Sequence, residues 1–128
     1  MKLSAEIVEF IRGSDHKVLA TYGDDGVNVI PLSMVTVDEE HIVICDCFMD
    51  KTRNNVRQDP RVALAFWKGF DGVQVKGTIV YESEGDRFGH HADKLKEEHP
   101  DRQLCGVLVF TPEKLYDLAP KNAGKQLA

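Results

Sequence analysis

Clusters of turn-forming residues divide this sequence into short apolar segments, and that spacing constrains the fold more than any other feature. The clearest clusters are Gly23-Asp24-Asp25-Gly26, Asp38-Glu39-Glu40 and Gly69-Phe70-Asp71-Gly72. Glycine and aspartate tolerate the positive φ angles that tight hairpin turns require. Strands joined by such short turns run antiparallel. The sequence therefore predicts a chain built mainly from antiparallel β-strands.

The apolar segments between the turns have the composition and length of strands. Strands are predicted over residues 17–22, 27–37, 41–47, 61–68, 73–81, 104–110 and 114–118, with a short helix as the alternative for the last of them. The first three are expected to form an antiparallel meander. Pro31 interrupts the second strand and cannot donate a ladder hydrogen bond, so that strand is expected to lie at an edge or to bulge there. Apolar residues fill both alternating sets of positions in 61–68, so this strand is predicted to be buried on both faces.

Two short helices are predicted where the strand pattern breaks. Ser4 is a good N-cap for the first, because its hydroxyl can accept a free amide hydrogen bond, and Gly13 can end that helix. The second is predicted over residues 50–59, with Asp50 as its N-cap and Pro60 as its stop.

A third, longer helix is predicted over residues 84–99, where apolar side chains form one stripe. Six or seven short antiparallel strands with three helical interruptions predict a small closed or partly closed β-barrel. The 128 residues are enough for one domain, expected over residues 1–120, followed by a loose tail at 121–128.

Composition excludes several functional classes. The 16 Lys and Arg against 21 Asp and Glu give a net charge of −5, which argues against general nucleic-acid binding. No apolar run approaches the roughly 20 residues of a membrane-spanning helix, and Glu6 precedes any long apolar stretch, so no signal peptide is expected. Three cysteines are too few for a disulfide scaffold. The expected location is cytoplasmic, without a membrane or nucleic-acid partner.

Residues 51–61 are locally basic, with four Lys or Arg residues and one acid, Asp59. A helix N-terminus offers free amides and a partial positive charge. Lys51 adds an ammonium group and Thr52 adds a hydroxyl within the first turn. This combination suits a phosphate monoester. The alternative is a solvated basic helix face.

Residues 28–34 and the thiols of Cys45 and Cys47 are further candidates. A proline within an apolar strand leaves backbone groups that the ladder does not use, and a planar heteroaromatic ligand could bond to them. The alternative is a bulged edge strand. Cys45 and Cys47 share one face of a strand, where they could be redox-active, bind a metal or remain buried free thiols.

Four segments in this order resemble a known family. They are Val18-Leu19-Ala20-Thr21 with the following turn and Pro31; Lys51-Thr52 with Asn55-Val56 and 59–64; Val73-Gln74-Val75-Lys76-Gly77-Thr78; and 107–116. The chain is similar, over about residues 3–118, to the pyridoxamine 5′-phosphate oxidase-like, FMN-binding split β-barrel proteins, especially their short members.

The resemblance implies a six-stranded Greek-key split barrel that acts as a homodimer with FMN at the interface. By position, the family's cofactor contacts fall on Pro31, Leu32, Ser33, Cys45, Asp46, Lys51 and Thr52. Lys51 and Thr52 match the phosphate site, 31–33 match the strand along the isoalloxazine, and Cys45 and Asp46 match the strand end beside the ring. The larger oxidases carry an arginine at the start of the flavin strand and an Arg-Lys pair at the phosphate. This chain lacks the first and has Asp50-Lys51 for the second, so pyridoxamine-phosphate oxidase activity is not supported.

The leading hypothesis is an FMN-binding flavoprotein, acting as an oxidoreductase or an electron carrier. The sequence identifies neither its substrate or redox partner nor a catalytic side chain. A deazaflavin, which also carries phosphate, is a variant of this hypothesis. The alternatives are a haem-binding split barrel that uses His41 or His90, and a non-catalytic dimeric interaction domain.

Overall fold

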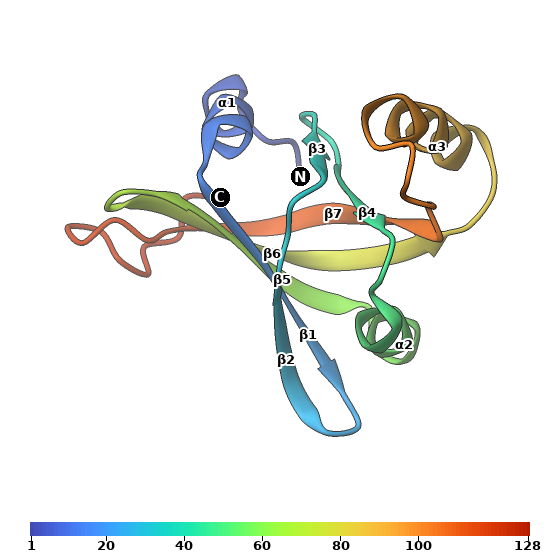
Figure 1. Ribbon diagram of the computed structural model, residues 1–128. Helices are drawn as coiled ribbons and strands as arrows, with labels where there is room; N and C mark the ends of the chain where they lie inside the picture. Colours follow the sequence, from blue (N-terminus) through green and yellow to red (C-terminus); the bar gives the residue numbers. More distant parts are fainter.

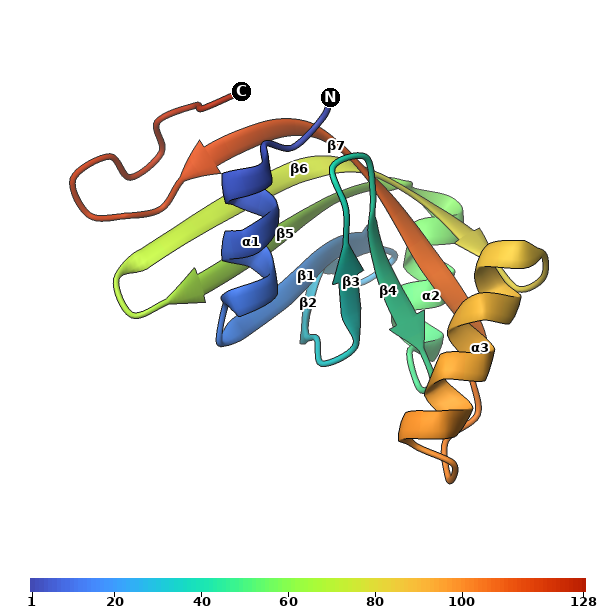
Figure 2. The ribbon, with the colours of Figure 1, turned by 90° about the horizontal axis from the view of Figure 1, so that it is seen from above.

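Seven antiparallel strands form one continuous sheet that curls into a half-barrel (Figures 1 and 2). The computed structural model describes residues 1–128. The strands are β1 His16–Gly23, β2 Gly26–Pro31, β3 Val35–Val37, β4 Ile42–Asp46, β5 Arg61–Lys68, β6 Asp71–Glu82 and β7 Gly106–Asp117. The helices are α1 Ala5–Gly13, α2 Asp50–Gln58 and α3 Asp86–Glu98. Across the sheet the order is β2-β1-β5-β6-β7-β4-β3, and the predicted mainly β architecture is confirmed.

The predicted strand over 27–37 divides into β2 and β3, which lie at opposite edges of the sheet. The linker is fixed at both ends: Leu32 N–H donates to Lys17 O of β1 (2.9 Å), and Met34 O accepts from Cys45 N–H of β4 (3.1 Å). Pro31 lies on an edge strand, as predicted. The predicted meander of the first three strands is wrong. β2 pairs with β1 at one edge of the sheet, whereas β3 pairs with β4 at the other edge.

The two predicted strands 104–110 and 114–118 are one strand, β7, and the helical alternative for the second is wrong. β7 pairs with β6 along almost its whole length, with a register shift at Lys76/Gly77. Pro112 lies opposite Gly77 at that shift. An irregularity of this kind lets a proline occupy a strand without breaking it.

The core has two apolar clusters on opposite faces of the sheet. The inner cluster includes Leu64, Phe66 and Phe110 and receives Val8 and Ile11 of α1, which lies over the inner face (Figure 2). The second cluster lies under α3 and comprises Val43, Cys45, Cys47, Leu95, Leu104, Val107 and Val109. Because β4 lies between the two clusters, all five of its residues are buried.

β5 is buried on one face rather than on both. Val62, Leu64 and Phe66 are buried, whereas the alternating residues Ala63, Ala65 and Trp67 are half-exposed. No helix covers the outer face of this part of the sheet, so the apolar outer positions remain accessible (Figure 1).

The helices begin and end close to their predicted bounds. The Ser4 hydroxyl accepts from Ile7 N–H at 3.2 Å, and α1 ends at Gly13, as predicted. Asp50 is not the N-cap of α2. It is the first helical residue, and its carboxylate instead pairs with Arg53 at 2.6 Å. None of the three helices combines the length and hydrophobicity needed to cross a membrane.

The C-terminal residues run back beside β7. Leu127 N–H donates to Leu115 O at 2.7 Å, and Leu115 N–H donates to Ala128 O at 2.8 Å. The side chains of residues 121–128 are all exposed. The looseness of this tail, and the domain boundary before it, stay predictions.

We predict opposite effects for two glycine-to-alanine substitutions. A Cβ on Gly77 would collide with Thr111 O and the Phe110 ring, so Gly77→Ala should lower the free energy of unfolding by about 2–3 kcal/mol. Gly89, within α3, has open space around it, so Gly89→Ala should raise it by about 0.5–1 kcal/mol. Urea unfolding of both variants tests this; equal effects would contradict the packing argument.

Candidate functional site

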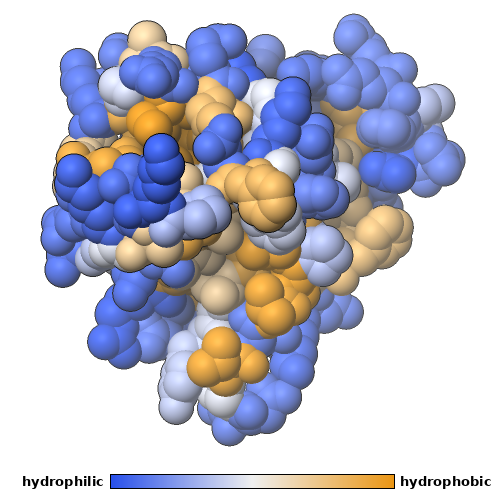
Figure 3. Space-filling view, turned by 90° about the vertical axis from the view of Figure 1, so that its left-hand side faces the viewer, coloured by the Kyte–Doolittle hydropathy of each residue, from blue (hydrophilic) through white to orange (hydrophobic).

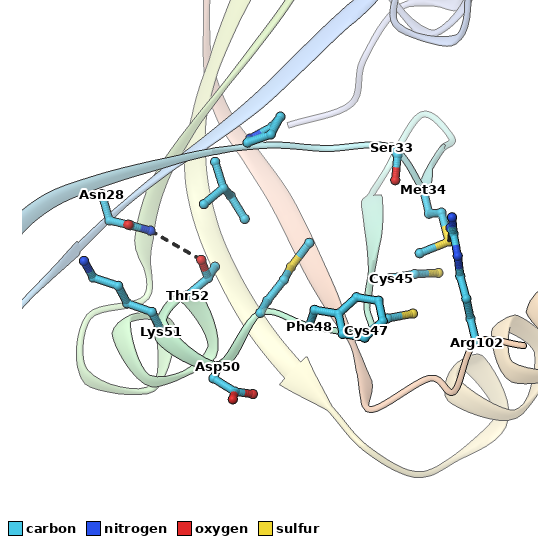
Figure 4. A pocket seen from close by; sticks show the side chains of 13 residues that line it. Asn28, Ser33, Met34, Cys45, Cys47, Phe48, Asp50, Lys51, Thr52 and Arg102 are labelled. Atoms are coloured by element: carbon cyan, nitrogen blue, oxygen red, sulfur yellow. Dashed lines mark hydrogen bonds between the residues drawn. The ribbon is translucent and has the colours of Figure 1, made fainter.

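A cavity of about 410 Å³ opens where the sheet is split between β2 and β4 (Figure 4). Its walls come from β2, the linker after it, the end of β4, the start of α2 and the loop before β7. The lining residues are Asn28, Ile30, Pro31, Ser33, Met34, Cys45, Cys47, Phe48, Met49, Asp50, Lys51, Thr52 and Arg102. A wider groove of about 790 Å³, between α1, the β5–β6 turn and the C-terminal segment, contains none of the predicted site residues.

The structure brings five of the seven predicted residues to this one cavity: Pro31, Ser33, Cys45, Lys51 and Thr52. The other two lie outside its lining. Leu32 packs against the inner core, and Asp46 is fully buried. His41 and His90, the haem ligands considered above, do not line the cavity either.

A buried polar network holds the start of α2 against the β1–β2 hairpin. Asn28 donates to the hydroxyls of Thr52 and Thr21, each at 3.3 Å, and Asn55 donates to Thr21 at 3.0 Å. A side chain at Gly23 would collide with Asn55, so glycine is needed for this approach. The network fixes Thr52, which is 2% exposed, at the cavity wall.

Lys51 projects from the first turn of α2 at the cavity mouth. Its Nζ lies 2.6 Å from Asp25 Oδ2, and both side chains are well exposed. The hydrogen bond and positive charge of Lys51 lower the pKa of Asp25. An exposed pair of this kind contributes little to stability, so the ammonium is free to exchange its partner.

Asp46 connects β4, α2 and β6 beneath the cavity. Its Oδ1 accepts from Met49 N–H at 2.7 Å and its Oδ2 from the Tyr81 hydroxyl at 2.6 Å. Arg53 Nη1 lies 3.6 Å from Oδ2. A carboxylate from the preceding strand therefore binds the amide of the α2 N-cap residue, Met49, and no side chain caps the helix amides in the way predicted for Asp50.

Tyr81 is held closely in this arrangement. Burial and the hydrogen bond to Asp46 raise the pKa of its hydroxyl to about 12. The Arg57 guanidinium lies over the Tyr81 ring, 5.2 Å from its centroid. A Cβ on Gly106 would collide with the Tyr81 side chain, so the glycine opposite Asp46 leaves room for the ring.

Sequence reasoning missed Phe48, Arg102 and the side-chain contact of Asn28. Phe48 is 85% exposed at the cavity edge. Arg102 comes from the loop before β7, and Figure 4 shows it at the opposite end of the cavity from Lys51. No local pattern marks it, because only the pairing of β7 with β4 brings this loop to the cavity. The alternation of Asn28 with Val27 and Val29 predicts the opposite direction for Asn28, because apolar residues are expected to face inward, yet both valines are exposed.

The two strand thiols share one face, as predicted, and are free. Burial raises the pKa of Cys45 to about 11, and the neighbouring Cys47 adds to the rise. Burial also raises the pKa of Cys47. Both thiols are therefore protonated at neutral pH and are poor nucleophiles there.

Tyr81→Phe should lower the free energy of unfolding by about 1–2 kcal/mol near pH 8, because the buried Asp46 carboxylate loses a donor. The Tyr81 pKa of about 12 in the folded protein exceeds the ordinary value of 10.0. This contribution is therefore complete below pH 10 and is lost as the pH rises to about 12. Denaturant unfolding across that range measures it. Tyr116→Phe is the control, since no hydrogen bond uses the Tyr116 hydroxyl; an equal loss in both variants would refute the role of Asp46.

Comparison with known proteins agrees with this geometry. Residues 3–119 match the model of the family described as pyridoxamine 5′-phosphate oxidase. An uncharacterised protein of Methanocaldococcus jannaschii is 33% identical, over 100% of this chain and 89% of its own length.

Solved structures share the fold at low identity. HupZ of Group A Streptococcus superposes with a TM-score of 0.83 at 17% identity, covering 95% of this chain and 98% of its own. An FMN-binding protein of Syntrophomonas wolfei superposes with a TM-score of 0.75 at 20% identity, covering 89% and 87%. The family match and the split half-barrel agree: this chain belongs to the pyridoxamine 5′-phosphate oxidase family and has the split-barrel fold.

Proposed function

We propose that this protein is an FMN-binding flavoprotein whose cofactor occupies the cavity at the split between β2 and β4. The observation that carries the proposal is the meeting of Lys51, Thr52 and the start of α2 at one end of a cavity that Ile30 and Pro31 also line. A phosphate and a flat apolar ring need these two environments side by side. The volume of about 410 Å³ lies within the range of roughly 300–1,000 Å³ that small-molecule sites occupy.

The α2 end suits the phosphate of FMN. The first amides of the helix and its dipole favour an anion, and the Thr52 hydroxyl can donate to a phosphate oxygen while it accepts from Asn28. Lys51 supplies a full positive charge at the mouth. A phosphate monoester carries about −1.5 to −2 charges, more than the single carboxylate of Asp25, so it competes well for the ammonium.

The linker between β2 and β3 suits the ring. The backbone N–H groups of Ser33 and Met34 donate no hydrogen bond within the protein, although both residues line the cavity. They are available to the carbonyl oxygens and ring nitrogens of an isoalloxazine. Leu32 supports this wall from the core side, because its side chain packs inward.

We further propose a homodimer with the cofactor at its interface. Val27 and Val29 point outward from β2 and are 77% and 63% exposed, and Tyr22 lies opposite Val27 on β1. Figure 3 shows apolar surface toward the bottom of the molecule, where this hairpin lies. The alternate residues Asn28 and Ile30 of the same strand line the cavity, so a second copy on the outer face would stand beside it.

Bound FMN would supply electron transfer, and the chain would supply binding, orientation and control of water access. Lys51 and Thr52 would hold the phosphate, and residues 31–33 would orient the ring. Neither Cys45 nor Cys47 is a ready base at neutral pH, since burial raises the pKa of both thiols. The proposed activity is therefore that of an oxidoreductase or electron carrier in the cytoplasm, with its substrate or redox partner to be identified.

The absorption spectrum of the purified protein tests the proposal directly. We expect flavin absorbance that is released on denaturation, and uptake of added FMN by stripped protein. A haem spectrum would favour the haem-binding alternative, and a deazaflavin spectrum would identify the related cofactor. Colourless protein that binds none of these would overturn the proposal and favour an interaction domain.

Two substitutions should move FMN affinity in opposite directions. Lys51→Ala should weaken FMN binding by about 10–100-fold and leave riboflavin binding unchanged, because only FMN has the phosphate. Asp25→Asn should tighten FMN binding by roughly 2–5-fold, since it removes the charge that competes for Lys51. Isothermal titration with both ligands measures the effects.

Asp24→Asn is the matched control, because Asp24 lies in the same turn and no ion pair joins it to Lys51. It should change FMN affinity less than Asp25→Asn does. Equal losses of FMN and riboflavin binding in Lys51→Ala would refute the phosphate role of Lys51.

A further inference from the structure

Two cysteines lie close together just beyond the end of the β4–β7 ladder. The last paired residues are Asp46 and Gly106, and Cys47 and Cys105 follow just beyond them. The two segments are still in contact there, because Cys105 N–H donates to Asp46 O at 2.8 Å. The Cys105 Sγ lies 3.7 Å from the carbonyl oxygen of Cys47. The second sulfur therefore already lies against the backbone of the first cysteine.

Backbone geometry selects this pair among the three thiols. The contact of Cys105 Sγ with Cys47 O at 3.7 Å puts these two residues side by side, as a disulfide with Cα atoms about 4.4–6.8 Å apart requires. Cys45 and Cys47 are two residues apart on one chain, a separation of roughly 6.5–7 Å with parallel side chains. Cys45 faces Val107 across the ladder and has no cysteine opposite it.

Accessibility differs between the two members of the pair. Cys105 is exposed, whereas Cys47 is buried and lines the cavity. A soluble oxidant therefore meets Cys105 first. Cys47 then lies within reach as the resolving thiol.

We propose that Cys47 and Cys105 form an oxidation site that closes to an intramolecular disulfide, with a small-molecule disulfide such as oxidised glutathione as the oxidant. The Cys105 thiolate attacks one sulfur of the oxidant and expels a glutathione thiolate, which takes up a proton. The Cys47 thiol loses its proton and attacks Sγ of Cys105, which expels the second glutathione. Two electrons pass from the protein to the oxidant, and two glutathione thiols are produced.

The disulfide would join two walls of the cavity. Cys47 immediately precedes Phe48 and the start of α2, and Cys105 ends the loop that carries Arg102. Both Phe48 and Arg102 line the cavity. Oxidation therefore fixes the loop before β7 to the segment that leads into α2. This inference does not depend on which cofactor binds.

The test is oxidation of the folded protein in glutathione buffers, followed by alkylation of the remaining thiols and peptide mapping by mass spectrometry. We expect one cross-link, between Cys47 and Cys105, with Cys45 alkylated. In concentrated guanidinium the selection should disappear and all three pairings should form. The oxidised protein should melt on the order of 10 °C above the reduced protein, since the cross-link constrains the unfolded chain.

Cys45→Ser is the matched control and should form the same cross-link with the same shift in melting temperature. Cys105→Ser, at an exposed position that is expected to tolerate serine, should abolish both. Circular dichroism confirms that each variant is folded. A Cys45–Cys47 link, a disulfide between two chains, or only a stable glutathione adduct on Cys105 in the folded protein would overturn the proposal.

Discussion

The candidate site depends on one buried carboxylate. Asp46 is fully buried at the end of β4, and three groups from α2 and β6 surround it: the Met49 amide, the Tyr81 hydroxyl and the Arg53 guanidinium. A charge without partners at this depth would cost several kcal/mol, so these groups must converge for the chain to fold. Their convergence sets where α2 begins. The start of α2 in turn sets the positions of Lys51 and Thr52, so the residue beneath the cavity controls the geometry of the end where these two side chains lie.

The split in the sheet and the cavity are one structural feature. A single segment supplies both edge strands, and its linker crosses from β1 to β4 instead of continuing a ladder. The crossing leaves the amides of Ser33 and Met34 without protein acceptors, and the cavity opens between β2 and the end of β4. Closing the barrel would satisfy the backbone and remove the cavity. The fold therefore retains unused hydrogen-bonding groups at the place where a ligand can use them.

Features with local causes could be predicted from the sequence, and features with distant causes could not. The Ser4 cap, the hairpin at 23–26 and the buried alternation of β6 each follow from neighbouring residues. The division of 27–37, the fusion of two predicted strands into β7 and the contacts of Asp46 depend on partners elsewhere in the chain. Arg102 reaches the cavity only because β7 pairs with β4. The family resemblance brought the candidate residues together in advance, but it did not show that Asp46 lies beneath the cavity and not in its wall.

An acidic protein can still hold an anion if the local charge is arranged for exchange. Lys51 pairs with Asp25 at the surface, where water screens the pair and its loss costs little. A phosphate dianion at the start of α2 would meet the same ammonium together with the helix amides and Thr52, none of which Asp25 engages. The carboxylate therefore neutralises the lysine without blocking the helix terminus. Affinity for an anionic ligand would then depend on how much more favourably Lys51 interacts with the ligand than with Asp25. The net charge of −5 would affect only the long-range approach of the ligand to the protein.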